Sequence, residues 1–321
     1  MTEFGHGRAR RLVPRAGLLD AEVAGDDVAA NLTRQEVAEA WAAVSVLRHV
    51  ATYQYSVAIT RMEHRLVVIP RRHHGDQQRV EHRFRVLVDD EKHPTQLHTR
   101  TDRFGNTIVD IHAHSVDRQI QFETRAVVSR VAGDDAPHWH EPGVDPRTDL
   151  TDASADLRRS ARDADGAGSA TERARRLMAH VAEQFTYGKG ATTVKTSAAE
   201  AWDLKQGVCQ DMAHVLIAML TEVGIPARYV SGHLVGEGAS HAWIEALDPA
   251  TGVVTAFDPT HDRVTDLRYV TVAVGRDYSD VSPTAGTVWA DTASGGKLQI
   301  EKQFRVVDAY GPHQYEEGRD R

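Results

Sequence analysis

The chain has 321 residues, enough for one large domain or two domains of ordinary size, and 41% of them are hydrophobic, enough for a substantial core. Its formal net charge of -8 argues against a protein that binds nucleic acid. The single cysteine excludes an intramolecular disulfide framework, and the sequence shows neither an apolar run long enough to cross a membrane nor a signal peptide. We therefore expect a soluble cytoplasmic protein without nucleic-acid or membrane partners. Its oligomeric state stays open.

Residues 1–45 are expected to form an N-terminal extension with one short helix. Thr33 and Glu36 have the spacing of a helix capping box. The apolar residues that follow recur at intervals of three and four, which is typical of a helix. These residues are Val37, Ala40, Trp41, Val44 and Leu47.

Residues 46–131 show the period-two alternation of short antiparallel strands. A strong turn sequence at residues 102–106 separates two of the strands. Regular strands of this kind predict a β-sandwich-like domain. The expected strands cover residues 51–59, 80–88, 107–114 and 119–131.

Three histidine pairs within or just after this region raise the question of a metal site. No cysteine accompanies them, and their spacing does not complete a tetrahedral zinc site. We therefore expect no metal and no cofactor. The pairs are His73 with His74, His112 with His114, and His138 with His140.

Residues 132–170 are rich in Asp, Pro, Ala, Ser and Gly and are expected to form a linker with at most one helical turn. A catalytic domain is expected over residues 171–310, followed by a polar tail at 311–321. Its first predicted elements are an amphipathic helix over residues 171–185 and a helix capped by Ser197. Strands are expected near residues 267–274 and 295–307.

The single cysteine, Cys209, follows Gly207 and opens a helical pattern that ends at Gly224. A thiol in the first turn of a helix lies near the positive end of the helix dipole and near unpaired N–H groups, which favour a thiolate nucleophile. The same N–H groups could hold an oxyanion. The apolar positions of the pattern are Met212, Leu216, Leu220 and Val223.

Two strand patterns downstream, at residues 241–247 and 253–257, are joined by a turn sequence and predict a hairpin. His241 begins the first strand and Asp258 follows the second, so the two would lie side by side. Asp258 could then orient His241, and His241 could deprotonate Cys209. Residue types and spacing alone also allow a buried structural cysteine, an ordinary histidine and an Asp-Pro turn.

Four ordered blocks resemble the transglutaminase-like superfamily, whose core has a Cys at a helix start, then a His strand, then an Asp strand. The resemblance extends to bacterial members with a preceding β-rich region and covers about residues 46–310. It implies that Cys209, His241 and Asp258 are the nucleophile, the base and the orienting residue. The blocks are residues 207–211, 224–232, 240–243 and 257–260.

Four further residues are candidates for the oxyanion site or the substrate cleft. Gln210 neighbours the nucleophile, although adjacent helix positions diverge. Trp243 also fits a core position, and His261 also fits an exposed one. The candidates are Gln210, Tyr187, Trp243 and His261.

The sequence thus predicts an α+β protein, in which an N-terminal antiparallel β-sandwich-like domain precedes a transglutaminase-like, papain-like core. The expected function is attack by a cysteine on amide bonds of peptides or proteins through a thioester. No EF-hand-like calcium motif is present, so a peptidase or amidase is favoured. A protein-glutamine transglutaminase and a non-catalytic binding module of the same fold are the alternatives.

Overall fold

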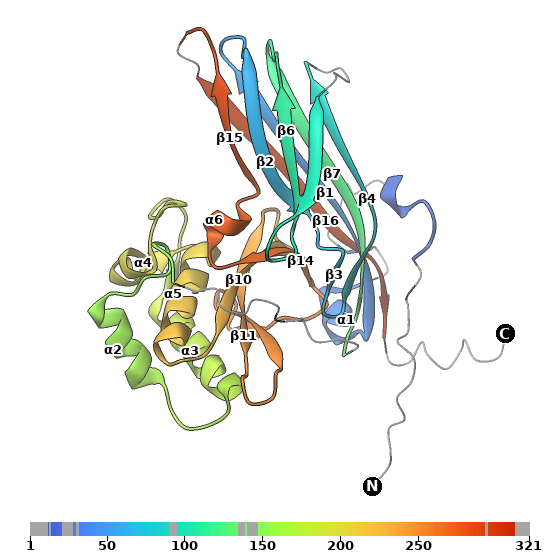
Figure 1. Ribbon diagram of the computed structural model, residues 1–321. Helices are drawn as coiled ribbons and strands as arrows, with labels where there is room; N and C mark the ends of the chain where they lie inside the picture. Colours follow the sequence, from blue (N-terminus) through green and yellow to red (C-terminus); the bar gives the residue numbers. More distant parts are fainter. Residues whose placement is uncertain are drawn as a thin grey trace, which may run out of the picture.

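The computed structural model describes residues 12, 14–20, 28–29, 32–89, 95–133, 139, 147–292 and 295–311 (Figure 1). The histidine pair His138 and His140 and nearly all of the predicted tail lie outside these residues. The described chain forms a β domain and an α/β core that lie against each other, which confirms the α+β expectation. Within the described part of the chain, no helix is both long and apolar enough to cross a bilayer.

The β domain consists of two antiparallel sheets packed face to face. The first contains, in order, β16 (Gly296–Tyr310), β1 (Ala42–Tyr55), β7 (Gln119–Val131), β4 (Gln77–Val88) and β3 (His73–His74). The second contains β15 (Thr284–Trp289), β2 (Arg61–Ile69), β6 (Thr107–Ala113) and β5 (Gln96–Thr101). Alternating side chains of both sheets form the shared core, among them Met62, Leu66, Ile111, Ile120 and Phe122.

The last two strands belong to the β domain, and their assignment to the catalytic domain is wrong. β16 pairs with β1 from Ala42 opposite Tyr310 to Tyr55 opposite Gly296, and β15 pairs with β2. Alternation in the sequence predicts that a segment is a strand but not which strand it joins. In this chain the partners lie far apart in sequence.

The N-terminal helix is shorter than predicted. α1 (Arg34–Glu39) has the expected capping box between Thr33 and Glu36, but β1 already begins at Ala42. The prediction of helix as far as Leu47 is therefore wrong. Much of β1 is buried on both faces, so its sequence is an apolar run without clean alternation.

In the core, four helices lie on one side of an antiparallel sheet made of long and short strands (Figure 1). The helices are α2 (Ala155–Ala164), α3 (Ala170–Gln184), α4 (Ala198–Leu204) and α5 (Cys209–Glu222). The sheet order is β13 (Arg263–Val264), β12 (Val254–Asp258), β11 (His241–Leu247), β10 (Ala227–Leu234) and β14 (Tyr269–Gly275). Smaller elements are η1 (Leu18–Asp20), β8 (Thr186–Tyr187), β9 (Gln206–Gly207) and α6 (Tyr278–Val281).

α5 is buried almost all around, because the other helices cover one side of it and β10 and β11 cover the other. α2 contributes to this packing, so the prediction of a linker with one helical turn over residues 132–170 is wrong. Leu157 and Ala161 of α2 are fully buried, and Ser154 caps the helix. The sequence of α2 has few apolar residues among many charged ones, so its helical periodicity is a weak signal.

The two parts of the protein are joined along β14, which is an edge of the core sheet. Gln77 donates from Nε2 to the carbonyl of Thr271 and accepts from its N–H, both at 2.8 Å. Asn106 does the same for Val274, at 2.7 Å and 2.9 Å. Two side-chain amides of the β domain therefore supply the hydrogen bonds that a further strand would supply.

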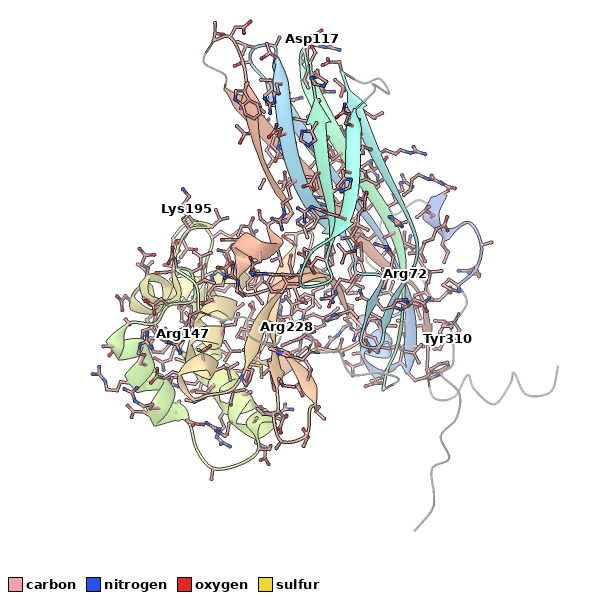
Figure 2. The ribbon with its side chains drawn as sticks, in the orientation of Figure 1. Arg72, Asp117, Arg147, Lys195, Arg228 and Tyr310 are labelled. Atoms are coloured by element: carbon pink, nitrogen blue, oxygen red, sulfur yellow. The ribbon has the colours of Figure 1, made fainter. Side chains whose placement is uncertain are left out.

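A buried ion cluster lies at the same boundary. The Glu245 carboxylate accepts from Arg228 Nε at 2.8 Å and from His74 Nε2 of the β domain at 2.6 Å. All three side chains are almost fully buried. Removing any one of them would therefore leave a charged or polar partner buried without a hydrogen bond. Figure 2 labels Arg228 within the core sheet, far from Asp117 at the outer end of the β domain.

The amide contacts generate a stability prediction. Asn106→Ala leaves the N–H and carbonyl of Val274 buried and unpaired, so we expect the free energy of unfolding to fall by about 2–4 kcal/mol. The measurement is equilibrium urea unfolding. The control is Gln54→Ala, which removes an exposed amide and should change stability by no more than about 0.5 kcal/mol. Equal losses in both variants would contradict the bonding role of Asn106.

Candidate active site

Cys209 is the first residue of α5, as the sequence predicts, and its side chain is half-buried. The entry to the helix is held by Asp211, whose Oδ2 accepts from the N–H of Val208 at 2.8 Å and from Thr192 Oγ1 at 2.7 Å. Asp211 packs so closely that a Cβ on Gly207 would lie 2.6 Å from its Oδ2. A glycine is therefore required at position 207, directly before the residue that caps the helix.

His241 and Asp258 lie at matching ends of the predicted hairpin. His241 is the first residue of β11, Asp258 is the last of β12, and the two strands pair through Ile244 opposite Phe257. His241 Nε2 donates to Asp258 Oδ2 at 2.8 Å, and both side chains are buried. Trp243 stacks along the ring of His241, with ring centroids 6.0 Å apart.

The Asp258 carboxylate gathers four donors. Its Oδ2 accepts from His241, from His261 Nδ1 at 2.9 Å and from the Tyr269 hydroxyl at 2.6 Å, and its Oδ1 accepts from the N–H of Thr260 at 2.9 Å. Burial acts to raise the pKa of Asp258, but the hydrogen bonds from His241 and His261 outweigh it and hold the pKa well below its ordinary value. The carboxylate is therefore ionised at neutral pH.

The imidazole of His241 is correspondingly held in its charged form. Burial alone would lower its pKa, but the hydrogen bond to Asp258 and contacts with Cys209 and Glu237 raise the pKa from 6.5 to about 12. Because the folded-state pKa lies above the unfolded one, this contribution to stability is complete below pH 6.5 and is lost as the pH rises toward 12.

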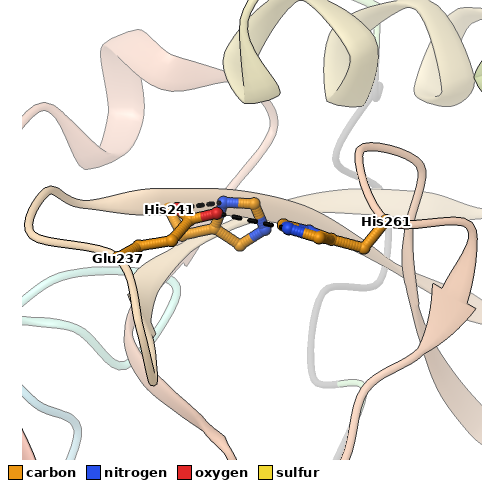
Figure 3. Close-up of side chains that lie close together, drawn as sticks. All are labelled: Glu237, His241 and His261. Atoms are coloured by element: carbon orange, nitrogen blue, oxygen red, sulfur yellow. Dashed lines mark ion pairs between the residues drawn. The ribbon is translucent and has the colours of Figure 1, made fainter. Parts of the chain in front are cut away.

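A second carboxylate, Glu237, faces the opposite edge of the His241 ring. Glu237 Oε2 lies 3.1 Å from His241 Nδ1, and its Oε1 lies 3.4 Å from His261 Nε2 (Figure 3). Burial raises the pKa of Glu237, but the two histidines outweigh this effect and lower the pKa. Glu237, His241, Asp258 and His261 thus form a closed ring of ionisable groups beside Cys209.

The other predicted site residues differ in how deeply they are buried and in what they contact. Tyr187 is half exposed on β8, where it pairs opposite Gly207, and burial followed by the Cys209 charge raises its pKa. His261 belongs to the ring of ionisable groups, with a third of its side chain exposed. Gln210 is buried, and its Nε2 has no hydrogen-bond partner among the described residues.

Trp243 does not line the cleft, so its assignment there is wrong. It is 1% exposed and packs with Val230, Leu234 and Tyr269, on the same face of the sheet as His241, which lies two residues before it. Its effect on the site is to support the ring of His241. His214, expected to be structural, is buried and accepts from the N–H of Tyr278.

Sequence reasoning missed Glu237 and Tyr269. Glu237 lies in the segment between β10 and β11, four residues before His241, and only its proximity to a candidate catalytic histidine could have indicated it. Tyr269 begins β14, and nothing in its strand pattern shows that its hydroxyl reaches across to Asp258.

Comparison with known proteins agrees with this architecture. Residues 158–259 match the family described as the transglutaminase-like superfamily, and residues 46–129 match the bacterial transglutaminase-like N-terminal region. The chain therefore contains a transglutaminase-like core and a bacterial transglutaminase-like N-terminal region. The superfamily is typically one of cysteine enzymes, and the matched core contains Cys209, His241 and Asp258.

A solved structure of a candidate cysteine protease from Cytophaga hutchinsonii has the same fold. It superimposes with a TM-score of 0.64 over 84% of this chain and 92% of that chain, at 21% sequence identity. This likeness, together with the family match, confirms the predicted papain-like core preceded by a β domain.

Curated relatives come from mycobacteria. An uncharacterised protein of Mycobacterium tuberculosis is 36% identical over 132 residues, which is 37% of this chain and 42% of that protein. One from Mycobacterium leprae is 46% identical over 113 residues, 32% of this chain and 39% of that protein. The matches span about two fifths of the length of these relatives.

The charge of His241 can be tested by titration. We expect the ring to stay protonated in the native protein from about pH 5 to about pH 10, a window that brackets the ordinary histidine pKa of about 6.5. In Asp258→Asn the effect of burial should dominate, so the pKa should fall and the proton should leave within this window. The measurement is NMR of selectively labelled histidine rings.

The control for this titration is Asp262→Asn, which changes an exposed carboxylate four residues further along the chain and should leave the His241 signal unchanged. A native His241 that titrates near pH 6.5, or an identical titration in Asp258→Asn, would contradict the dominant role of Asp258.

Proposed function

We propose that the chain is a cysteine enzyme that hydrolyses amide bonds of peptides or proteins through a thioester intermediate. One observation carries this proposal: the ring of His241 is bound to the buried Asp258 carboxylate through Nε2 and also contacts the Cys209 side chain. In this proposal Cys209 is the nucleophile, His241 is the acid and base, and Asp258 fixes the ring orientation.

In the acylation step the Cys209 sulfur attacks the amide carbonyl carbon, and the bond from that carbon to nitrogen then breaks. The proton on His241 passes to the nitrogen, which leaves as an amine. The first turn of a helix has N–H groups without intrahelical partners, so the start of α5 offers donors for the oxyanion. The product of this step is a thioester on Cys209.

In the deacylation step a water molecule occupies the place vacated by the amine. His241 takes a proton from the water as its oxygen attacks the thioester carbon, and the bond from carbon to sulfur breaks. The acyl group leaves as a carboxylic acid, and the thiolate and imidazolium are restored. An amine in place of water would give a new amide, which is the transglutaminase alternative.

The proposal is tested with fluorogenic peptide libraries for hydrolysis and with incorporation of a fluorescent primary amine into protein for transfer. We expect a peptide substrate to be cleaved, and Cys209→Ala and His241→Gln to lower kcat/KM by at least about 10³-fold. The control is His112→Gln, which changes an exposed histidine on β6 and should retain full activity.

Intact mass spectrometry separates the alternatives. A thioester adduct on Cys209 followed by release of the acid supports hydrolysis, whereas an amine-containing product supports transfer. Peptide binding without any turnover or adduct in the native protein would favour a non-catalytic module and overturn the proposal. Turnover that survives in Cys209→Ala would overturn the assigned nucleophile.

A further inference from the structure

The two histidines of the site are arranged so that each has one nitrogen occupied and one nitrogen turned toward the same place. His241 Nε2 and His261 Nδ1 both bond to Asp258 Oδ2, at 2.8 Å and 2.9 Å. Their remaining nitrogens, His241 Nδ1 and His261 Nε2, both face Glu237 (Figure 3). One oxygen of Glu237 and these two nitrogens lie within 4.8 Å of one another.

We propose that Glu237, His241 and His261 form a binding site for Zn²⁺ or a similar thiophilic divalent ion, and that Cys209, which lies outside this group of three, closes onto the ion as the fourth ligand. Four ligand atoms placed about 2.0–2.1 Å from a tetrahedral Zn²⁺ lie about 3.3 Å from one another. The distances from Glu237 to His241 Nδ1 and to His261 Nε2 are 3.1 Å and 3.4 Å. These two distances run from different oxygens of Glu237, and one oxygen and the two nitrogens lie within 4.8 Å of one another, so the ligand atoms would have to approach by up to about 1.5 Å to reach the spacing that the ion requires.

The surroundings of the two histidines also fit a metal site. A histidine that binds a metal through one nitrogen usually donates its other N–H to a carboxylate, which fixes the tautomer and the ring orientation. Asp258 makes this contact with both rings. His241 Nδ1 is buried and faces Glu237 Oε2 at 3.1 Å, so a ligand nitrogen is already directed into the site.

The donor set selects the kind of ion. Imidazole nitrogens, one carboxylate and a thiolate suit Zn²⁺, whereas Ca²⁺ and Mg²⁺ prefer oxygen ligands alone. The side chains of Glu237 and His261 are 29% and 33% exposed, so an ion can enter from solvent. His241, at 1%, supplies the fixed inner ligand.

A bound ion would occupy the atoms that the proposed reaction needs. It would displace the proton from His241 Nδ1 and hold the sulfur of Cys209, so neither base nor nucleophile would be available. The site would then act as a reversible off-state that responds to free zinc. This consequence rests on the proposed function, whereas binding of the ion itself does not.

The test uses the full chain, stripped of metal with a chelator and titrated with Zn²⁺ by calorimetry and with Co²⁺ by absorption spectroscopy. We expect one ion per chain, protection of Cys209 from iodoacetamide, and a thiolate-to-cobalt charge-transfer band. Glu237→Gln and His261→Gln should each weaken binding by at least about tenfold. Cys209→Ala should abolish the charge-transfer band.

The control is Glu63→Gln, because Glu63 and His112 form an exposed carboxylate–histidine pair at 3.8 Å without a second histidine. This variant should bind the ion as the native protein does. Circular dichroism and thermal unfolding establish that each variant is folded. If Glu237→Gln and His261→Gln fold but bind as tightly as the native protein, the ion sits elsewhere and the inference is overturned.

Absence of saturable binding at one equivalent, or an unchanged cobalt spectrum in Cys209→Ala, would also overturn the assigned ligand set. The two proposals fail separately. Peptide turnover in chelator without zinc binding would remove only the metal site, whereas zinc binding without any turnover would remove only the proposed hydrolysis.

Discussion

A buried carboxylate that must keep its charge constrains the whole candidate active site. An ionised Asp258 in a nearly dry environment is tolerable only because donors reach it from several directions. They come from His241 on the neighbouring strand, Tyr269 on β14 and two residues of the turn that follows β12. Hairpin register, turn conformation and the placement of β14 are thus linked through one side chain.

The same dependence explains why the β domain matters for the site. β14 carries the hydroxyl that reaches Asp258, and its outer edge is paired with the side chains of Gln77 and Asn106. Buried Glu245, one of whose partners is His74 of β3, connects β11 to the β domain in a similar way. The strands that hold His241 and Asp258 are therefore positioned from both sides, by helices on one face and by the β domain beyond β14.

Local features of the site could be predicted from the sequence, and features that depend on distant partners could not. The start of α5 at Cys209 follows from Gly207 and from apolar spacing, and the hairpin that carries His241 follows from two short strands and a turn. Both are decided within a few residues. Tyr269 reaches Asp258 from a strand on the far side of β10, and no periodicity encodes such a contact.

The errors in the fold have related physical causes. The first part of β1 has a helix-like sequence pattern, because burial on both faces removes the alternation by which strands are recognised. The sequence of α2 resembles a linker, because only a narrow stripe of the helix surface, Leu157 and Ala161, is apolar and buried. β16 was recognised as a strand, but its pairing with β1 required knowledge of the three-dimensional arrangement.

The pairing of β1 with β16 gives the molecule the topology of a closed loop. The core leaves the β domain after Val131 and returns to it at Thr284, so both ends of the core segment are anchored in one scaffold. Bringing the two halves of that scaffold together requires closing a very long stretch of chain, a step that slows folding more than it weakens stability. Once β1 and β16 have paired, they restrict the unfolding of the core, because the two ends of the core segment cannot move apart. A single backbone cut within the core would leave two fragments still held together by an intact sheet.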